Sequence, residues 1–164
     1  VMEAALRTVY EVVTGETLAD VNFTAVRGLE GVKEATVKVG DLDVKVAVAS
    51  GLSNARKLMD LIMEGKAEYH FIEIMCCPGG CLGGGGQPIP TTDEVRLARM
   101  KAIYAEDEGL PMRKSHENPA VKALYEEFLG EPNSHKAHEL LHTHYTPKSI
   151  WPVDMCCECE EVTK

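Results

Sequence analysis

Apolar residues recur three and four positions apart in five parts of the chain, and this spacing predicts five helices. The predicted helices cover residues 1–13, 54–63, 92–104, 119–129 and 134–142. Gly15 is suited to end the first helix, Ser53 could cap the second, and Pro119 stands at the favoured first position of the fourth. Between the first two helices the period changes from helical to two, which is typical of strands.

Four strands are predicted, over residues 21–26, 34–39, 43–49 and 69–74. The middle two are rich in Val and Ala and face each other across Gly40-Asp41, as in a hairpin. The last strand follows helix 54–63, and a strand, a helix and a strand in this order indicate a parallel pair joined by a right-handed crossover. The pattern therefore predicts an α/β fold, whose ligand loops are expected at the carboxyl ends of strands.

Composition narrows the class of protein. The 164 residues suit one domain, with 45% hydrophobic and 26% charged side chains. A net charge of −9 argues against binding nucleic acid or a membrane surface, which needs clustered Lys and Arg. We expect no membrane span, because no apolar run approaches about 20 residues, and no signal peptide opens the chain. Six cysteines fall in two tight clusters, unlike a disulfide scaffold, so a reducing cytoplasm is expected.

The strongest chemical signal follows the last predicted strand. Cys77 and Cys81 flank Pro78-Gly79-Gly80, and a glycine run over residues 83–86 comes next. Thiolates are soft ligands suited to iron–sulfur clusters, zinc or Cu(I), and glycines let the backbone approach a cluster closely. A pair of small buried thiols in a glycine turn is the alternative. Because such a glycine-rich turn is costly to fold without a ligand, the pattern favours a metal site.

The whole string from residue 73 to 90, Glu-Ile-Met-Cys-Cys-Pro-Gly-Gly-Cys-Leu-Gly-Gly-Gly-Gly-Gln-Pro-Ile-Pro, resembles the third cluster-binding signature of the iron-only hydrogenases. Further segments resemble the same family in the same order, at residues 1–8, 26–31, 113–119 and 135–142. The resemblance covers residues 1–147, whereas the tail from 152 to 164 has no counterpart.

The resemblance implies one lobe of the two-lobed iron-only hydrogenase fold, with a small mixed or parallel sheet flanked by helices and a helical carboxyl-terminal part. It places this lobe in residues 1–150 and leaves a Cys- and Glu-rich tail in 151–164. The implied cofactor is a 4Fe-4S cubane linked to a di-iron centre, with Cys77 and Cys81 as metal ligands and Cys81 as the bridge. Met75 is implied to contact the di-iron part. Cys76 stands where the family has Ala, which favours a core filler over a ligand.

The implied function is the cluster-binding part of an anaerobic enzyme that interconverts protons, electrons and molecular hydrogen. Two further signatures of the family, Thr-Ser-Cys-Cys-Pro and Met-Pro-Cys-x-x-Lys, are absent from the sequence. We therefore expect a truncated product or one subunit of a split enzyme, inactive alone and without a catalytic residue of its own. Expected partners are the missing amino-terminal half and ferredoxin or NAD(P)-coupled electron-transfer subunits. An iron–sulfur assembly factor and a hydrogen sensor are the alternatives.

Other candidate ligands favour structural roles. His135, His138 and His142 have a spacing that could ligate zinc, but no H-E-x-x-H pattern joins them, so packing and hydrogen bonding are expected. His116 is predicted to tie helices together by hydrogen bonds. The acidic run 106–108 is predicted to be a solvated face. For the tail cysteines a soft-metal site and an unstructured redox-active end both stay open; they are Cys156, Cys157 and Cys159.

Overall fold

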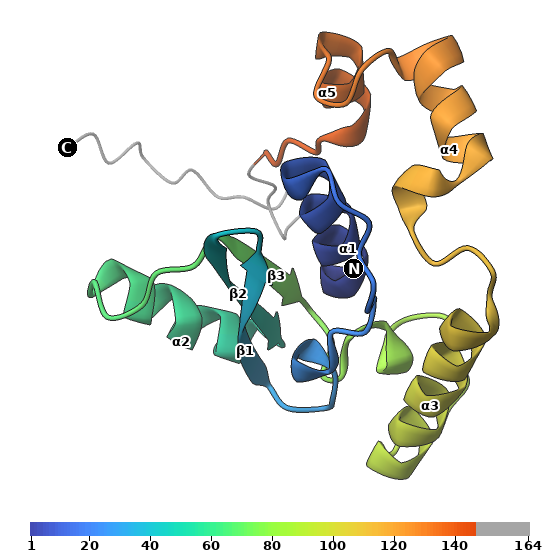
Figure 1. Ribbon diagram of the computed structural model, residues 1–164. Helices are drawn as coiled ribbons and strands as arrows, with labels where there is room; N and C mark the ends of the chain where they lie inside the picture. Colours follow the sequence, from blue (N-terminus) through green and yellow to red (C-terminus); the bar gives the residue numbers. More distant parts are fainter. Residues whose placement is uncertain (147–164) are drawn as a thin grey trace, which may run out of the picture. The chain divides into compact units, whose positions relative to one another are not determined.

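The computed structural model of the chain describes residues 1–146 and divides the chain into two compact units, 1–121 and 122–164. The tail cysteines, and the boundary predicted at residue 150, lie outside the described residues. The first unit contains the sheet, the cysteine loop and the helices α1 to α3 (Figure 1). Among the described residues, no helix is long and apolar enough to cross a membrane.

A three-stranded mixed sheet forms the centre of the first unit. Its strands are β1 (Val32–Val39), β2 (Leu42–Ser50) and β3 (Phe71–Met75), in the order β1-β2-β3. β1 and β2 are antiparallel, and β2 and β3 are parallel, which confirms the predicted hairpin and the parallel pair. Lys33, Val48 and Glu73 lie in register across the three strands, so their side chains leave the same face of the sheet.

Two helices cover opposite faces of this sheet (Figure 1). On one face α1 (Met2–Thr14) buries Met2 and Leu6 against Val46 and Val48 of β2. On the other face α2 (Leu52–Met63) packs Leu58 against the alanines of β2. The alternation of Val and Ala along β2 thus gives each helix its own apolar surface, because successive strand residues point to opposite faces.

Two local predictions are wrong. Residues 21–26 form no strand: the Val21 carbonyl accepts from Nε of Arg7 at 2.8 Å, and the Asn22 amide donates to Asp20 Oδ1 at 2.9 Å. A single 3-10 turn, Thr24–Val26, follows. The backbone groups of this segment are therefore satisfied by side chains and a turn, which leaves no ladder to form. Ser53 does not cap α2, because the helix already begins one residue earlier and Gly51 takes the cap position.

The third helix, α3 (Asp93–Gly109), begins as predicted and ends five residues later than the predicted end at 104. The Thr92 side chain caps it by accepting from the Val95 amide at 3.4 Å. The extra turn carries Asp107, which was expected on a solvated face. Instead, Arg7 of α1 donates two bonds of 2.9 Å to its carboxylate, and Arg113 donates a third of 2.7 Å. These bonds hold the pKa of Asp107 well below its usual range, chiefly through Arg7.

The segment 119–129 is helical as predicted but changes period within its length. It begins as α4 (Pro119–Leu124) and continues as a π-helical turn, Tyr125–Leu129. Within the second unit, α5 (His135–Leu141) follows, and its cap Ser134 accepts from the Ala137 amide at 3.2 Å and donates to the Leu129 carbonyl at 2.7 Å.

The α/β class predicted from the sequence is confirmed.

Candidate functional site

The cysteine loop leaves the carboxyl end of β3, where the parallel arrangement predicts a ligand loop. Met75 ends the strand, and the chain then turns through Gly79 and Gly80, with φ of 75° and 70°. Two consecutive residues in the left-handed region require glycine, because a side chain there would clash with the backbone. The Gly80 amide closes the turn on the Cys77 carbonyl at 2.9 Å, and a 3-10 turn, Gly80–Gly83, carries Cys81.

Two sulfur atoms lie where glycines leave room for them. A Cβ atom added to Gly80 would lie 2.7 Å from Sδ of Met75, which is too close for any real contact. A Cβ atom on Gly84 would lie 3.3 Å from Sγ of Cys77. The thioether and one thiol are thus packed against bare backbone, which is the cradle expected for soft ligands around a cluster.

Two arginines of α3 support the loop from its other side. Arg99 donates to the Leu82 carbonyl at 2.8 Å and to the Pro88 carbonyl at 2.6 Å. Nε of Arg96 lies 2.8 Å from the position that a Cβ of Gly83 would take. Nε is itself buried without a hydrogen-bond partner among the described residues. The loop is therefore fixed by the Arg99 guanidinium, while the guanidinium of Arg96 lies against the loop and pairs with Asp93 at 2.5 Å.

A cavity of about 580 Å³ opens between the loop and the sheet. Met75 and Cys81 both line it, and Cys81 is exposed. Cys77 is half-buried and is not among the lining residues, and its contact is with Gly84. Cys76 is exposed, so the expectation of a core filler is wrong. Because Met75 faces the cavity, the next residue points to the opposite side.

Charged side chains that sequence reasoning missed also line the cavity. Lys33 and Glu73 reach it from the sheet, and Glu3 of α1 pairs with Arg27 at 2.5 Å. Arg27 also stacks over the ring of Tyr104, 4.0 Å from its centroid. Burial lowers the pKa of Lys33 and raises that of Tyr104. The available signal for Lys33 was its place two residues before Ala35, on the inward-facing side of the hairpin. The predicted strand, however, began at residue 34, two residues after the observed start.

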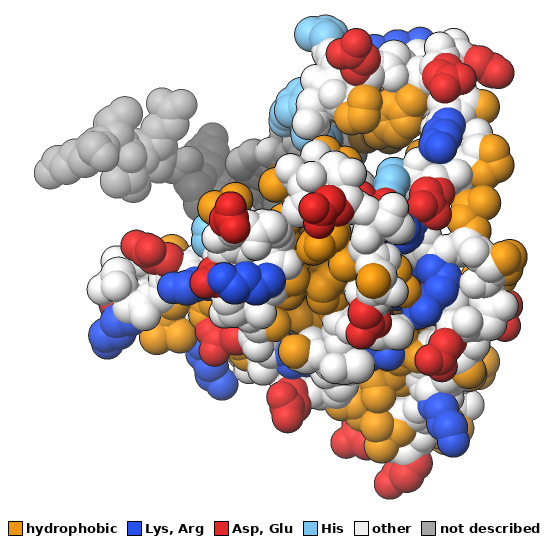
Figure 2. All heavy atoms as spheres, in the orientation of Figure 1, with side chains coloured by type: hydrophobic (Ala, Val, Ile, Leu, Met, Phe, Trp, Pro, Cys, Tyr) orange, Lys and Arg blue, Asp and Glu red, His pale blue; other side chains and the backbone are white. Residues whose placement is uncertain are grey.

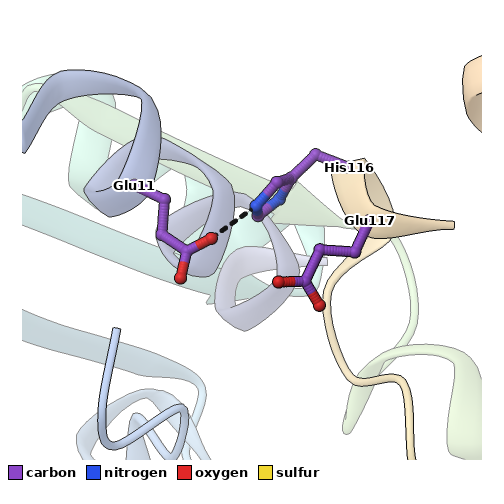
Figure 3. A group of neighbouring side chains, drawn as sticks. All are labelled: Glu11, His116 and Glu117. Carbon is purple, nitrogen blue, oxygen red and sulfur yellow. Dashed lines mark hydrogen bonds and ion pairs between the residues drawn. The ribbon is translucent and has the colours of Figure 1, made fainter. Parts of the chain in front are cut away.

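A second polar cluster joins α1 to the 3-10 turn Ser115–Glu117 (Figure 3). The Glu11 carboxylate bonds Nε2 of His116 at 2.7 Å and accepts from Nζ of Lys114 at 2.6 Å, while Nδ1 of His116 bonds the Thr8 hydroxyl at 3.0 Å. Lys114 first, then the Leu18 amide and His116, lower the pKa of Glu11 to about 2.

Glu11, His116 and Glu117 bring ligand atoms within 4.8 Å of one another, as three metal ligands would. Lys114, however, bonds both carboxylates, since its ammonium also donates to Glu117 at 3.2 Å. The cluster is therefore a closed network of ion pairs, and the structural role predicted for His116 is confirmed. Among residues 1–146 no other such triad occurs; the rings of His138 and His142 instead contact edge to face, with centroids 4.1 Å apart.

The chain matches two family models, described as the iron only hydrogenase large subunit, C-terminal domain, over residues 1–85, and the iron hydrogenase small subunit, over residues 93–148. It is 57% identical over 146 residues to the NADP-reducing hydrogenase subunit HndD of Solidesulfovibrio fructosivorans, and 43% identical over 150 residues to iron hydrogenase 1 of Clostridium pasteurianum. Each match covers 88% of this chain but only 25% and 26% of those relatives.

Relatives with other names match as well. The human nuclear prelamin A recognition factor is 35% identical over 79% of this chain and 28% of its own length. A probable cytosolic Fe-S cluster assembly factor of Drosophila mojavensis is 35% identical over 82% of this chain and 28% of its own length. A solved FeFe-hydrogenase from Chlamydomonas reinhardtii is 42% identical with a TM-score of 0.69, covering 88% of this chain and 43% of that one. The chain therefore belongs to the iron-only hydrogenase family, with residues 1–85 similar to the C-terminal domain of its large subunit and residues 93–148 similar to its small subunit.

Proposed function

We propose that the loop from Met75 to Gln87 holds part of the catalytic iron–sulfur cofactor of an iron-only hydrogenase. Cys77 and Cys81 are the proposed metal ligands, and Cys81 is the proposed bridge to a di-iron centre. The observation that carries this proposal is the convergence of Cys81 and Met75 on one cavity, beside glycines whose missing Cβ atoms leave room for sulfur.

The donor set fits half of such a cofactor. A cubane takes four thiolates, and the described loop offers Cys77 and Cys81 as the proposed pair. The chain spans about a quarter of the length of the curated relatives. We infer that the two remaining thiolates come from the amino-terminal part of the hydrogenase, in the same polypeptide or in a partner subunit. A pyridine-nucleotide-coupled electron donor is supported by the name of the Solidesulfovibrio relative.

The bound cofactor would supply reversible reduction of protons to hydrogen at its di-iron part. The residues of this chain would bind and shield it. The Met75 thioether is polarizable and apolar, so it can contact a soft metal group without adding charge. Val48 and Ile103 also line the cavity and give it apolar walls. Arg99 fixes the backbone on both sides of the glycine run through the Leu82 and Pro88 carbonyls.

The test uses a chimera in which this chain replaces the matching segment of the Solidesulfovibrio relative, produced with hydrogenase maturation proteins. We expect cubane iron, a reduced-cubane EPR signal, and hydrogen evolution from reduced viologen. Cys81→Ser should abolish turnover, because a hard hydroxyl is a poor bridge between iron centres. Cys76→Ala is the matched control and should retain the cubane and the hydrogen evolution. Turnover at the wild-type rate in Cys81→Ser would refute the ligand assignment.

The 164-residue chain by itself should not carry the complete cofactor. Reconstituted anaerobically with iron and sulfide, it should evolve no hydrogen, because two thiolates leave a cubane half-coordinated. About four irons per chain with a cubane signal, in a variant lacking Cys156, Cys157 and Cys159, would contradict this expectation.

A role in iron–sulfur assembly is the second candidate, and the relatives named as assembly and prelamin A recognition factors favour it. It predicts that the chimera binds a cubane and passes it to an apo-ferredoxin without evolving hydrogen. The catalytic proposal predicts hydrogen evolution and a cofactor that stays bound. Measuring both in one preparation separates the two functions.

A further inference from the structure

Lys33 is the only buried lysine in the part of the chain that the structure describes, with 7% of its surface exposed. It enters the cavity from β1, in register with Val48 and Glu73, and it lines the same space as Met75 and Cys81. A lysine this deeply buried normally has a paired charge, because burying an isolated ammonium is strongly unfavourable.

The ammonium of Lys33 lacks such a pair. It has three donors, and the described residues give it one acceptor, the Gly28 carbonyl at 3.1 Å. Among residues 1–146, no carboxylate oxygen lies within the 4.0 Å of an ion pair. Glu73 and Glu30 favour the ammonium from a distance, but burial outweighs them and lowers the pKa of Lys33.

The nearby carboxylates are engaged elsewhere. The Glu73 carboxylate accepts from the Met2 amide at 3.0 Å. Glu3 pairs with Arg27 at 2.5 Å on the α1 side of the cavity. The cavity therefore contains one buried cation whose remaining donors have no protein acceptor among the described residues.

We propose that Lys33 is the electrostatic partner of the anionic iron–sulfur group that Cys81 helps to hold, and that its ammonium favours the reduced form of that group. The inference rests on the proposed function. Each thiolate ligand adds a negative charge, and reduction adds one more electron, so a buried cation stabilises the reduced form more than the oxidised one. Net charge and hydrogen bonding near the sulfurs set the potential of such groups.

A purely structural role makes different predictions. In that case Lys33 would hold the turn at Gly28 by its single hydrogen bond, and its aliphatic stem would fill space between strand and loop. Lys33→Gln keeps an N–H donor for the Gly28 carbonyl but removes the charge, whereas Lys33→Met removes both. Lys33→Arg keeps the charge. Lys38→Met is the matched control, because it makes the same change on the same strand at an exposed ion pair with Asp43.

The experiment is a redox titration of these variants in the chimera described above, with dithionite supplying one electron and EPR reporting the reduced cubane. In Lys33→Met and Lys33→Gln the equilibrium constant for reduction of the cubane should fall about tenfold. This corresponds to a midpoint potential lower by about 59 mV. Lys33→Arg should stay near the wild-type value, and Lys38→Met should not shift.

The metal-free chimera provides a second readout. Without the anionic group the buried charge of Lys33 is unpaired, so Lys33→Met should raise the midpoint temperature of unfolding, while in the loaded protein it should lower it. Unchanged potentials in Lys33→Met and Lys33→Gln would overturn the inference, as would metal-free Lys33→Met that is less stable than wild type. A wild-type chimera that binds no iron would instead refute the proposed function itself.

Discussion

Replacing Gly80 by alanine would place a methyl group against the thioether that faces the cavity. Its Cβ would lie 2.7 Å from Sδ of Met75 and 3.2 Å from Cε. The backbone at this residue has φ of +70°, which costs a non-glycine residue about 1 to 2 kcal/mol. Overpacking in a filled site adds about 1 to 3 kcal/mol, and the flexible end of Met75 puts this addition near the lower limit.

The expected loss in the free energy of unfolding is therefore about 2 to 3 kcal/mol. Gly15→Ala is a control with the same φ of +70° and nothing within 4 Å of the added Cβ. It should therefore lose only the stability that a non-glycine residue costs at this φ. Urea unfolding of the metal-free chain, followed by circular dichroism, measures both losses.

A double-mutant cycle with Met75→Ala isolates the contact itself, since that change removes the atoms that the new methyl group meets. Gly80→Ala should cost about 1 kcal/mol less in the Met75→Ala background than in the wild type. Equal costs for Gly80→Ala and Gly15→Ala, or no coupling in the cycle, would show that the Met75 thioether does not lie against Gly80.

Three further changes test the supports of the site. Arg7→Met should lower the free energy of unfolding by about 2 to 4 kcal/mol in a urea titration, because Arg7 is 4% exposed and its loss leaves the Asp107 carboxylate without its strongest partner. The pKa of Glu11 is lowered from 4.5 to about 2, so its contribution is present above pH 4.5 and disappears as pH falls toward 2; Glu11→Gln should flatten that part of the stability curve in thermal melts across pH. Cys76→Ala should keep the iron content of the chimera, while Cys77→Ala should lose it, as measured by iron analysis; equal loss would make Cys76 a ligand.

The sequence was sufficient to place the cysteine loop on the correct edge of the sheet. The alternation of β2, the helix after it and the apolar run into β3 are local signals, and together they require a parallel pair. A glycine turn between Cys77 and Cys81 was also expected, and the left-handed φ of Gly79 and Gly80 explains why glycine stands there. The expected cytoplasmic location stays a prediction.

The errors at residues 21–26 and at Asp107 share a physical cause, which is a partner far away in the chain. Residues 21–26 alternate as a strand does, but Arg7, 14 residues earlier than Val21, binds the Val21 carbonyl. Asp107 looked solvated beside its acidic neighbours, whereas Arg7 binds it across 100 residues. Arg7, buried in α1, therefore accounts for both differences between prediction and structure. The apolar periodicity of α1 does not show that this arginine is buried.

The distribution of charge gives an independent reason to place an anionic group at the cysteine loop. The chain carries a net charge of −9, and acidic side chains are scattered over the surface in Figure 2. Two cations at the loop lack an acidic partner within residues 1–146, since Lys33 bonds one carbonyl and Arg99 bonds two, whereas Arg96 pairs with Asp93 at 2.5 Å. Lys33 lines the cavity beside Cys81, while Arg99 holds the loop from α3. Two cations without a carboxylate partner beside the cysteine loop, in a chain of net charge −9, support the proposal that the loop holds an anionic iron–sulfur group.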